Sequence, residues 1–343
     1  MKEVKLALVG FGNVGKALVQ LLDTKREILF QEFDFDPKVI GIATGRHGMA
    51  INPSGLVTHE AVTLSESGKN LDSLSTVPQP KSIIEFIQNC KADVLFENSP
   101  VNHHTGQPAT DHIKTALQSG MHAITANKGP VAHAYKDLTK LANEKQRRFL
   151  FESAVMDGAP IFSLFRGPLP AIELKGFQGI LNSCTNLLIE LMEQGKDFEE
   201  AVDYGQSIGI TETDPAADIE GWDAAIKVAA LCNVLMDGTV TPNQVKRTGI
   251  SGLTPAMIQE ALSAGERWKL VCTAKRTATG LETSVEPQRV AAISPLYSVN
   301  GTSSFVQFEM DTLPGLGILE SNPGPKTTAY GLLADLINVM RGA

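Results

Sequence analysis

The chain has 343 residues, of which 43% are hydrophobic and 20% charged, and its formal net charge is −8. At about 100–200 residues per domain, this length predicts two domains that bury substantial cores without covalent cross-links. The acidic balance argues against a nucleic-acid-binding protein, because such proteins usually present a basic face. No run approaches the ~18 apolar residues of a membrane span, and the opening residues are typical of a strand, not of a signal peptide. We therefore expect a cytoplasmic α/β protein with no membrane partner.

The spacing of the cysteines also indicates a reducing compartment such as the cytoplasm. They form no CxxC pair and show no metal-ligand spacing, so the sequence predicts neither a disulfide framework nor a zinc module. The four cysteines are Cys90, Cys184, Cys232 and Cys272.

A glycine-rich turn follows the first apolar run, Lys5–Val9, which predicts a buried parallel strand. Apolar residues at helical spacing come directly after it, so the order is strand, turn and helix. Gly10 permits a tight turn, Gly12 lets a pyrophosphate approach the backbone, and Gly15 lets the helix pack closely on the strand. A plain glycine-rich turn is the alternative to dinucleotide binding. The candidate cofactor-binding residues of this turn are Gly10, Phe11, Gly12, Asn13, Val14 and Gly15.

The choice between NAD and NADP depends on the end of the second strand, where NAD-binding proteins usually carry a carboxylate. Asp34 and Asp36 have nearly the required spacing, but the apolar run Val39–Ala43 begins after them. Arg46 follows that run and could meet a 2′-phosphate, which favours NADP and leaves NAD as an alternative. An ordinary surface arginine is the other interpretation of Arg46.

Alternating strands and helices continue to about residue 150, after an inserted loop with a short helix over residues 47–80. This alternation predicts a parallel sheet with ligands beyond the carboxyl ends of its strands. Ser99 and Lys128 follow two such ends, although a solvated surface lysine is the competing interpretation of Lys128. The expected strands are Asp93–Glu97, His122–Thr125 and Phe149–Phe151, and the expected helices are Asp111–Gln118 and one near Tyr135–Lys145.

The second half opens with the loop 152–160, whose backbone carbonyls could suit a monovalent cation. A strand over Ile172–Leu181 follows, and Asn186 is expected to cap a helix over Leu187–Glu193. Cys184 has no histidine near it in the sequence, so a packed small residue is favoured over a nucleophile. A further helix, Glu199–Ile208, ends at Gly209.

A charged pair on a mostly apolar helix is the strongest candidate for chemistry. Asp218 is expected to cap a helix from about Ile219 to Met236, on which Asp223 and Lys227 share one face. The pair is either a structural salt bridge or a half-buried acid–base pair that also binds the charged ends of an amino acid. The acidic residues just before it, Glu212, Asp214 and Asp218, favour the second interpretation, because like charges gathered without a function would repel.

At these residues the sequence resembles homoserine dehydrogenase. The matching segments are Gly10–Gly15, Gly120–Ala132, Gly179–Asn186, Gly209–Lys227 and the closing stretch Asn322–Asp335. The resemblance implies NAD(P)-dependent interconversion of L-aspartate 4-semialdehyde and L-homoserine, in threonine and methionine biosynthesis. It also implies a doubly wound Rossmann domain over 1–150 and 315–343, with an inserted α+β substrate and dimerisation domain over 151–314. A homodimer is expected through a sheet built from Lys269–Lys275, Glu282–Val285 and Ser304–Glu309.

The resemblance also implies residue roles. Lys227 resembles the family's proton donor and acceptor, and Lys128 the lysine between cofactor and substrate. The implied substrate-binding residues are Glu212, Asp223, Asp218 and Thr185. Besides the glycine turn and Arg46, the implied cofactor contacts are Ser99, Lys128, Gly209, Glu212 and Gly324. The backbone carbonyls that fall at the family's sodium site are those of Glu152, Val155, Asp157 and Ala159.

The sequence departs from the family pattern at three places. Met156 and Asp157 replace smaller residues in the loop before Pro160, and Asn322–Pro325 is poorer in Gly and Ala than is usual. Cys184 stands in a segment that usually reads GTTN. Length also leaves no room for the regulatory ACT domain of longer relatives, so threonine inhibition through such a domain is not expected.

Two other functions remain open at this point. A non-catalytic NADP-binding sensor would explain the altered loops, but it has no need of Glu212, Asp223 and Lys227. A different semialdehyde dehydrogenase would use Cys184 as a nucleophile and form a thioester.

Overall fold

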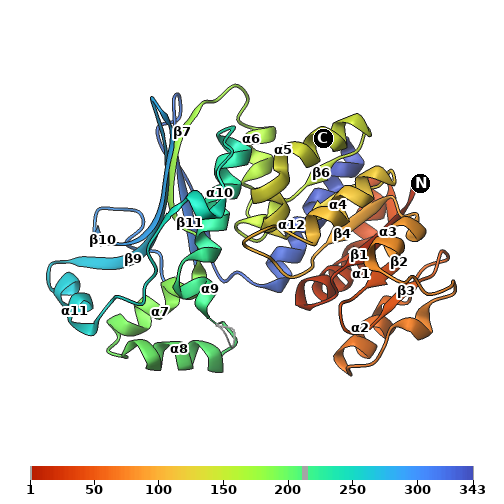
Figure 1. The fold of residues 1–343 in the computed structure, drawn as a ribbon, viewed down its shortest axis with the longest axis horizontal. Coiled ribbons are helices and arrows are strands. Elements are labelled where there is room, and N and C mark those ends of the chain that lie inside the picture. The colour runs from red at the N-terminus through yellow and green to blue at the C-terminus, as the bar shows by residue number, and fades with distance from the viewer. Residues whose placement is uncertain (1, 211–214, 343) are drawn as a thin grey trace. The chain divides into compact units, whose positions relative to one another are not determined.

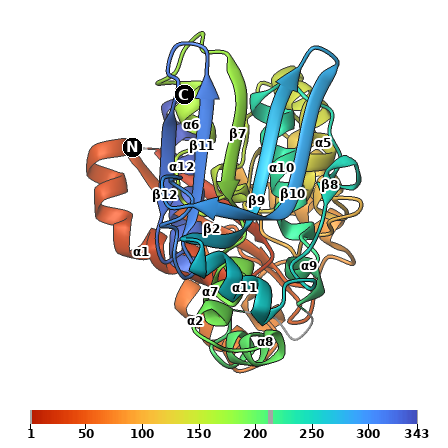
Figure 2. The same cartoon turned by 90° about the vertical axis from the view of Figure 1, so that its left-hand side faces the viewer.

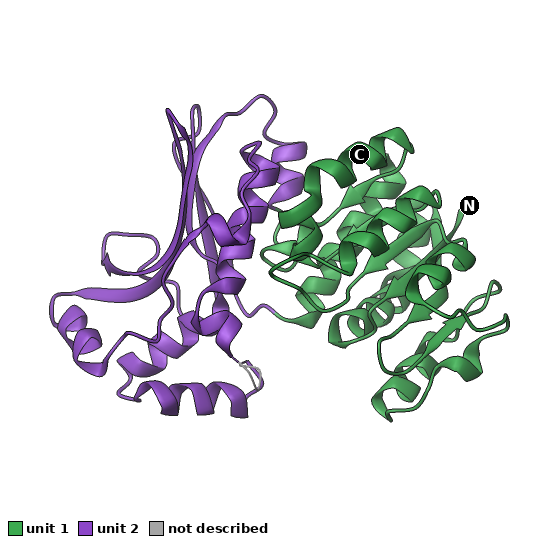
Figure 3. Ribbon diagram, viewed as in Figure 1, with its two compact units in different colours: residues 1–160, 324–343 green, residues 161–323 purple. Residues whose placement is uncertain are grey.

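The computed structural model describes residues 2–210 and 215–342. The chain divides into two compact units, residues 1–160 with 324–343 (unit 1) and residues 161–323 (unit 2), coloured separately in Figure 3. The sequence placed these boundaries at 150 and 315. They shift because residues 152–154 pack on the C-terminal helix, whereas the strand Leu316–Glu320 pairs with Ser304–Met310 in the sheet of unit 2.

Unit 1 contains a six-stranded sheet in the order β3-β2-β1-β4-β5-β6 (Figure 1). All neighbouring strands are parallel except β3, which runs antiparallel to β2. The chain leaves β1 toward β2 on one side and returns to β4 on the other, so the switch point where ligands bind in such sheets lies between β1 and β4. The strands are β1 (Lys2–Val9), β2 (Phe35–Ala43), β3 (Met49–Ile51), β4 (Val94–Glu97), β5 (His122–Thr125) and β6 (Phe149–Leu150).

Helices cover both faces of this sheet. The C-terminal helix α12 packs against α1, and the two share a core cluster with β1 and β4, whereas α3 and α4 contribute to a second cluster with Leu95. The helices of unit 1 are α1 (Asn13–Phe33), α2 (Thr58–Glu66), α3 (Ile83–Cys90), α4 (Ala109–Gln118), α5 (Lys128–Glu144) and α12 (Pro325–Arg341), with short 3₁₀ turns η1 (Asp72–Leu74) and η2 (Glu152–Ala154).

Several details of unit 1 differ from the sequence prediction. Strand β2 begins at Phe35, so Asp36 lies inside the strand and does not precede it as expected. The short strand β3 forms a hairpin with β2 inside the segment that was expected to be a loop with a helix. Helix α5 begins at Lys128, well before Tyr135, because the Asn127 side chain accepts a hydrogen bond from the backbone N–H of Gly129. Pro130 belongs to the first turn of this helix, where its missing N–H leaves no hydrogen bond unmade.

Unit 2 contains a second six-stranded sheet, in the order β12-β11-β7-β9-β10-β8, most of which is seen face-on in Figure 2. Its pairs are antiparallel except β10 with β8. The strands are β7 (Leu174–Ile180), β8 (Lys246–Arg247), β9 (Glu266–Thr277), β10 (Gly280–Ala291), β11 (Ser304–Met310) and β12 (Leu316–Glu320). The helices are α6 (Phe162–Arg166), α7 (Ser183–Glu193), α8 (Phe198–Ser207), α9 (Ala216–Ile219), α10 (Trp222–Leu235) and α11 (Pro255–Ser263), with the 3₁₀ turn η3 (Pro242–Gln244).

The predicted cap of α7 was wrong by four residues. Asn182 caps the helix by accepting from the N–H of Thr185, and the helix begins at Ser183. Asn186 lies inside it, 1% exposed, and its amide donates to the carbonyls of Val299 and Gly301. The fully buried Lys269 ammonium donates to Asn186 Oδ1 and to Val299 O, and burial lowers the pKa of Lys269 to about 8. These contacts hold the segment after β10 against the sheet.

The single long helix expected from Ile219 to Met236 is also interrupted. Gly221 has φ +80°, a left-handed conformation that ends α9 and precedes α10. Asp218 therefore lies in α9 and does not cap α10, so that prediction was wrong. The predicted residues Glu212 and Asp214 lie outside the described part of the chain.

Within residues 2–210 and 215–342, no helix combines the length and the apolar character that crossing a bilayer requires.

Candidate active site

The glycine turn of unit 1 has the geometry that a pyrophosphate needs. Gly10 has φ +91°, and a Cβ there would lie 2.3 Å from the backbone oxygen of Asn98, so β1 and β4 approach closely only because this residue is glycine. A Cβ on Gly15 would lie 2.7 Å from the Gly10 oxygen, which fixes the close packing of α1 on the turn. Gly12, the N-cap of α1, has open space where a Cβ would be, and the first turn of α1 holds no acidic side chain. Backbone N–H groups and the helix dipole can therefore meet an anion here.

The residues after β4 also suit a bound dinucleotide. Both amide atoms of the Asn98 side chain are buried and have no hydrogen-bond partner among the described residues. A buried amide without partners is costly, and a polar ligand at the switch point would satisfy it. Ser99 is half-buried, and its hydroxyl donates to the Glu97 carboxylate. The backbone N–H groups of the glycine turn and the Asn98 amide thus fit the phosphates and polar groups of a dinucleotide.

Arg46 lies where the sequence placed it, in the turn between β2 and β3, with an exposed side chain. Asp34 and Asp36, the two acidic residues considered for the cofactor, lie at the opposite end of β2. Asp36 pairs with Arg26 at 2.6 Å, and this hydrogen bond lowers the pKa of the Asp36 carboxyl. Asp36 is therefore held in a structural pair, and Arg46 is the charged candidate at the carboxyl end of β2.

Lys128 is the first residue of α5 and is half-buried. Its neighbour Asn127 caps the helix and also donates from Nδ2 to the backbone oxygen of Ser99 at 3.0 Å. The loops after β4 and β5 are thereby joined, so the predicted positions Ser99 and Lys128 belong to one part of unit 1.

The loop that was predicted to bind sodium is fastened to the start of α12. The Asp157 carboxylate accepts from the N–H of Gly324 and from the hydroxyl of Thr327, both at 2.7 Å. The N–H of Glu152 donates to the Asp335 carboxylate at 2.7 Å. Asp157, which departs from the family pattern, thus ties the loop to Gly324. Val155 and Ala159 in the same loop are buried.

Unit 2 brings together the charged residues of α9 and α10 with the end of β7. The Lys227 ammonium lies 3.1 Å from Asp223 Oδ2 and donates to the backbone oxygen of Leu181 at 2.6 Å. The Asn182 amide donates to Asp218 at 2.6 Å and to Asp223 at 3.0 Å. The side chains of Lys227 and Asp223 are 15% and 13% exposed, so the pair is half-buried at the surface of unit 2.

Asn182 is the functional candidate that the sequence interpretation missed. It stands within the segment Gly179–Asn186 that carried the family resemblance, but only as part of a motif. Thr185 is fully buried, and its hydroxyl donates to Asn182 Oδ1 at 2.9 Å, so Thr185 is connected to the two carboxylates through Asn182. Gly209 is exposed after α8 with φ +74°, and Glu212 lies outside the described residues.

The cysteines lack the exposure of a nucleophile. Cys184 is 4% exposed in the first turn of α7. Burial raises the pKa values of Cys90, Cys232 and Cys272 to about 12, which keeps these thiols protonated near neutral pH. A thioester mechanism through a cysteine is therefore not supported by the described residues.

Comparisons with known proteins match both units of the chain. The family model for homoserine dehydrogenase matches residues 160–337, and the model for the homoserine dehydrogenase NAD-binding domain matches residues 10–152. The chain is 36% identical over its whole length to an NAD(+)-dependent homoserine dehydrogenase of Pseudomonas canavaninivorans, of which it covers 98%. It is 35% identical to the homoserine dehydrogenase of Methanocaldococcus jannaschii, with 97% of this chain and 98% of the relative aligned.

Solved structures show the same fold. A crystal structure of a putative homoserine dehydrogenase from Archaeoglobus fulgidus superposes with a TM-score of 0.87, at 28% identity over 98% of this chain and 99% of the other. A hyperthermophilic archaeal homoserine dehydrogenase in complex with NADPH superposes with a TM-score of 0.84, at 27% identity over 99% and 98%. Both the Rossmann-type unit and the second unit are thus accounted for, and the chain belongs to the homoserine dehydrogenase family.

Proposed function

We propose that Lys227 and Asp223 carry the chemistry of the family's reaction, the NAD(P)H-dependent reduction of L-aspartate 4-semialdehyde to L-homoserine. When bound, the reduced dinucleotide supplies the hydride that is added to the aldehyde carbon. Negative charge then develops on the aldehyde oxygen, and the Lys227 ammonium stabilises it and supplies the proton. The half-buried Lys227–Asp223 pair is the observation that carries this assignment.

The carboxylates beside Lys227 would hold the amino acid. Asp223 and Asp218 are fixed by the Asn182 amide, and fixed carboxylates can orient the ammonium group of the substrate. We assign Glu212 to the same task, as the family resemblance implies. Thr185 acts through its hydrogen bonds to Asn182.

Unit 1 is proposed to hold the dinucleotide through the glycine turn, Asn98, Ser99 and Lys128. Lys128, the second catalytic lysine of the proposal, adds positive potential beside the bound dinucleotide. Gly209, Glu212 and Gly324 are carried over from the resemblance as further contacts.

NADP is proposed as the favoured dinucleotide, with NAD also accepted. The exposed Arg46 at the end of β2 supports the first choice, because a guanidinium suits a 2′-phosphate. The relative that is named NAD(+)-dependent supports the second.

A sodium ion is proposed to brace the loop 152–160 through the carbonyls of Glu152, Val155, Asp157 and Ala159. Its support is the fastening of this loop to α12, which fixes the backbone from which those carbonyls project. A sodium role predicts that replacing sodium by choline in the assay lowers activity, and that adding sodium restores it.

A homodimer through the sheet of unit 2 is the proposed assembly. Helix α10 packs against β9 and β10 on one face of this sheet. The opposite face carries a row of side chains that includes Gln178, Gln307 and Thr273, and Leu319 on this face is 60% exposed. Light scattering tests the dimer, and Leu319→Glu should weaken it. A parent protein that stays monomeric at micromolar concentration contradicts it.

One assay tests the central proposal. The purified protein is mixed with NADPH and L-aspartate 4-semialdehyde, and the NADPH absorbance is followed. We expect consumption of NADPH with formation of homoserine, in the absence of phosphate. No oxidation of NADPH or NADH would contradict the proposal. An absolute requirement for phosphate would point instead to a thioester route. The four buried free cysteines suit the reducing cytoplasm in which we place this activity.

A further inference from the structure

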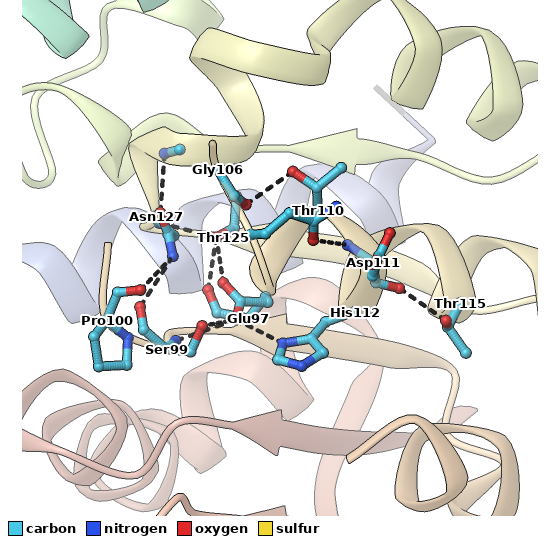
Figure 4. Close-up of polar contacts among 12 residues, drawn as sticks. Glu97, Ser99, Pro100, Gly106, Thr110, Asp111, His112, Thr115, Thr125 and Asn127 are labelled. Carbon is cyan, nitrogen blue, oxygen red and sulfur yellow. Dashed lines mark hydrogen bonds and ion pairs between the residues drawn. The ribbon is translucent and has the colours of Figure 1, made fainter. Parts of the chain in front are cut away.

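A buried carboxylate–imidazole pair lies at the carboxyl end of β4 in unit 1, where the dinucleotide is proposed to bind, and it has no place in the chemistry described above. Glu97, the last residue of β4, is 0% exposed, and His112 on α4 is 5% exposed. The Nδ1 atom of His112 lies 3.2 Å from Glu97 Oε1, although the two residues are 15 positions apart. Figure 4 shows the carboxylate surrounded by His112, Ser99 and Thr125.

The pair is joined to the loop that follows β4. The hydroxyl of Ser99 donates to Glu97 Oε1, and the N–H of Ser99 lies 3.3 Å from the same oxygen. The Oε1 atom of Glu97 thus contacts three groups: the N–H and the hydroxyl of Ser99, and the Nδ1 atom of His112. The direction in which the chain leaves the sheet at Ser99 depends on how this oxygen is held.

The pair is also joined to the start of α5. The hydroxyl of Thr125 donates to the backbone oxygen of Glu97 at 2.6 Å and lies 3.4 Å from Glu97 Oε2. It accepts from the N–H of Asn127 at 2.9 Å. Asn127 in turn caps α5, whose first residue is Lys128, and donates to the backbone oxygen of Ser99. The network therefore closes on itself through two loops (Figure 4).

A fully buried carboxylate persists only when it is compensated by hydrogen bonds and charge. Here Ser99 contributes donors from one loop, and His112 contributes an imidazole from a helix. Because every member has a partner, the network can fix a single arrangement of both loops. Removal of the His112 contact would leave the carboxylate underbonded, and Ser99 would move to compensate.

We infer that the buried Glu97–His112 pair is a positioning unit of this enzyme, which holds Ser99 and Lys128 in the arrangement that binds the nicotinamide dinucleotide. The inference rests on the proposed roles of Ser99 and Lys128, but it concerns neither the proton transfer at Lys227 nor the binding of the amino acid. In this role Glu97 and His112 set the geometry of the dinucleotide site and do not contact the dinucleotide themselves.

Two variants of His112 separate the hydrogen bond from the packing. Asn and Leu have nearly the same shape, but Asn keeps an amide donor near the place of Nδ1 and Leu has none. The dissociation constant of NADPH, measured by nicotinamide fluorescence on the full chain, should rise about tenfold in His112→Leu. In His112→Asn it should return to within about threefold of the parent value. The KM for NADPH should change in the same direction as the dissociation constant in each variant, whereas the KM for the semialdehyde should change little.

A second variant covers the case in which His112→Leu does not fold. Glu97→Gln keeps the shape of the side chain but removes one acceptor and the charge, so it should also weaken NADPH binding. Combining Glu97→Gln with His112→Leu should cost no more than the worse single change, because both break one network.

The matched control is His122, at the opposite end of β5 from Thr125. Its Nδ1 accepts from the N–H of Arg148 at 3.0 Å. His122→Leu should lower the Tm and leave the NADPH dissociation constant unchanged.

The inference is overturned if His112→Leu and Glu97→Gln lower only the Tm and bind NADPH like the parent. It is also overturned if His112→Asn is no better than His112→Leu. Dinucleotide binding is measured without the semialdehyde, so a failure of the role assigned to Lys227 would leave these results intact. A parent chain that binds neither NADPH nor NADH would contradict the proposed function and this inference together.

Discussion

The ammonium of Lys227 lies 3.1 Å from the carboxylate of Asp223, one helical turn earlier on α10. The same ammonium donates to the backbone oxygen of Leu181 at the end of β7. Two acceptors from different elements hold the lysine side chain in one orientation, which an exposed i,i+4 salt bridge does not achieve. The ammonium is thus held in one place while it remains partly open to solvent, as the proposed role of proton donor requires.

Replacement of Lys227 by Met should abolish most of the turnover. The unbranched side chain keeps the packing but cannot donate a proton, and loss of a general acid typically costs about 10²–10⁴-fold in rate. The kcat for semialdehyde reduction measures the effect. Binding of NADPH to unit 1 should be unchanged and serves as the control for folding. A rate within a few-fold of the parent would remove Lys227 from its assigned role.

Asn182 has two tasks that substitutions can separate. Its side chain caps α7, and its amide also donates to Asp218 and Asp223. Asn182→Ser keeps a good capping residue but loses both donors, whereas Asn182→Ala loses the cap as well. We expect both variants to raise the KM for the semialdehyde about tenfold, because hydrogen bonds to charged groups are lost.

Only Asn182→Ala should also lose stability, by about 1 kcal/mol. Thermal unfolding of the two variants measures this difference. An unchanged KM in Asn182→Ser would mean that the amide does no more than cap the helix.

Local signals explain what the sequence predicted well. The glycine turn, the strands β4 and β5 and the helix α8 each follow from residues within a short window, and the structure has them within a few positions of the expected bounds. The pair Asp223 and Lys227 was found in the same way, because i,i+4 spacing on a helix places two side chains together.

The wrong or missing predictions concern features that depend on contacts between residues far apart in the sequence. Asn182 and Asn186 are equally good capping residues, but the Oδ1 atom of Asn186, which would have to accept from the helix, accepts instead from Lys269, 83 residues away. The Nδ2 atom of Asn186 donates to Val299 and Gly301, which are still farther along the chain. The break at Gly221 is hidden in the sequence because apolar residues continue on both sides of it. The Glu97–His112 pair could not be predicted, since a strand ending and one helical face give no sign that they meet.

Arg46 should discriminate between the two dinucleotides. Arg46→Ala is expected to raise the KM for NADPH about fivefold and to leave the KM for NADH unchanged, because only NADPH carries the 2′-phosphate. Arg26→Ala is the matched control, since this exposed arginine pairs with Asp36 at the other end of β2. Equal losses for both dinucleotides would exclude Arg46 as the phosphate contact.

His122 should make the stability of unit 1 sensitive to acid. Burial, followed by the nearby charge of Arg147, lowers the pKa of His122 to about 4 from a model-peptide value of 6.5. Between these two values the unfolded chain binds a proton that the folded chain does not, so the free energy of unfolding falls as the pH is lowered from about 6.5 to about 4. Above pH 6.5 this contribution is fully present, and below pH 4 it is lost.

His122→Asn tests this dependence, because its amide oxygen can still accept from the N–H of Arg148 but cannot titrate. The Tm of the variant, measured by calorimetry at several pH values, should decline less steeply than that of the parent between pH 6.5 and 4. The exposed His59 on α2 provides the control, and His59→Asn should keep the slope of the parent. Parallel curves for the parent and His122→Asn would show that the folded and unfolded chains protonate this imidazole at the same pH.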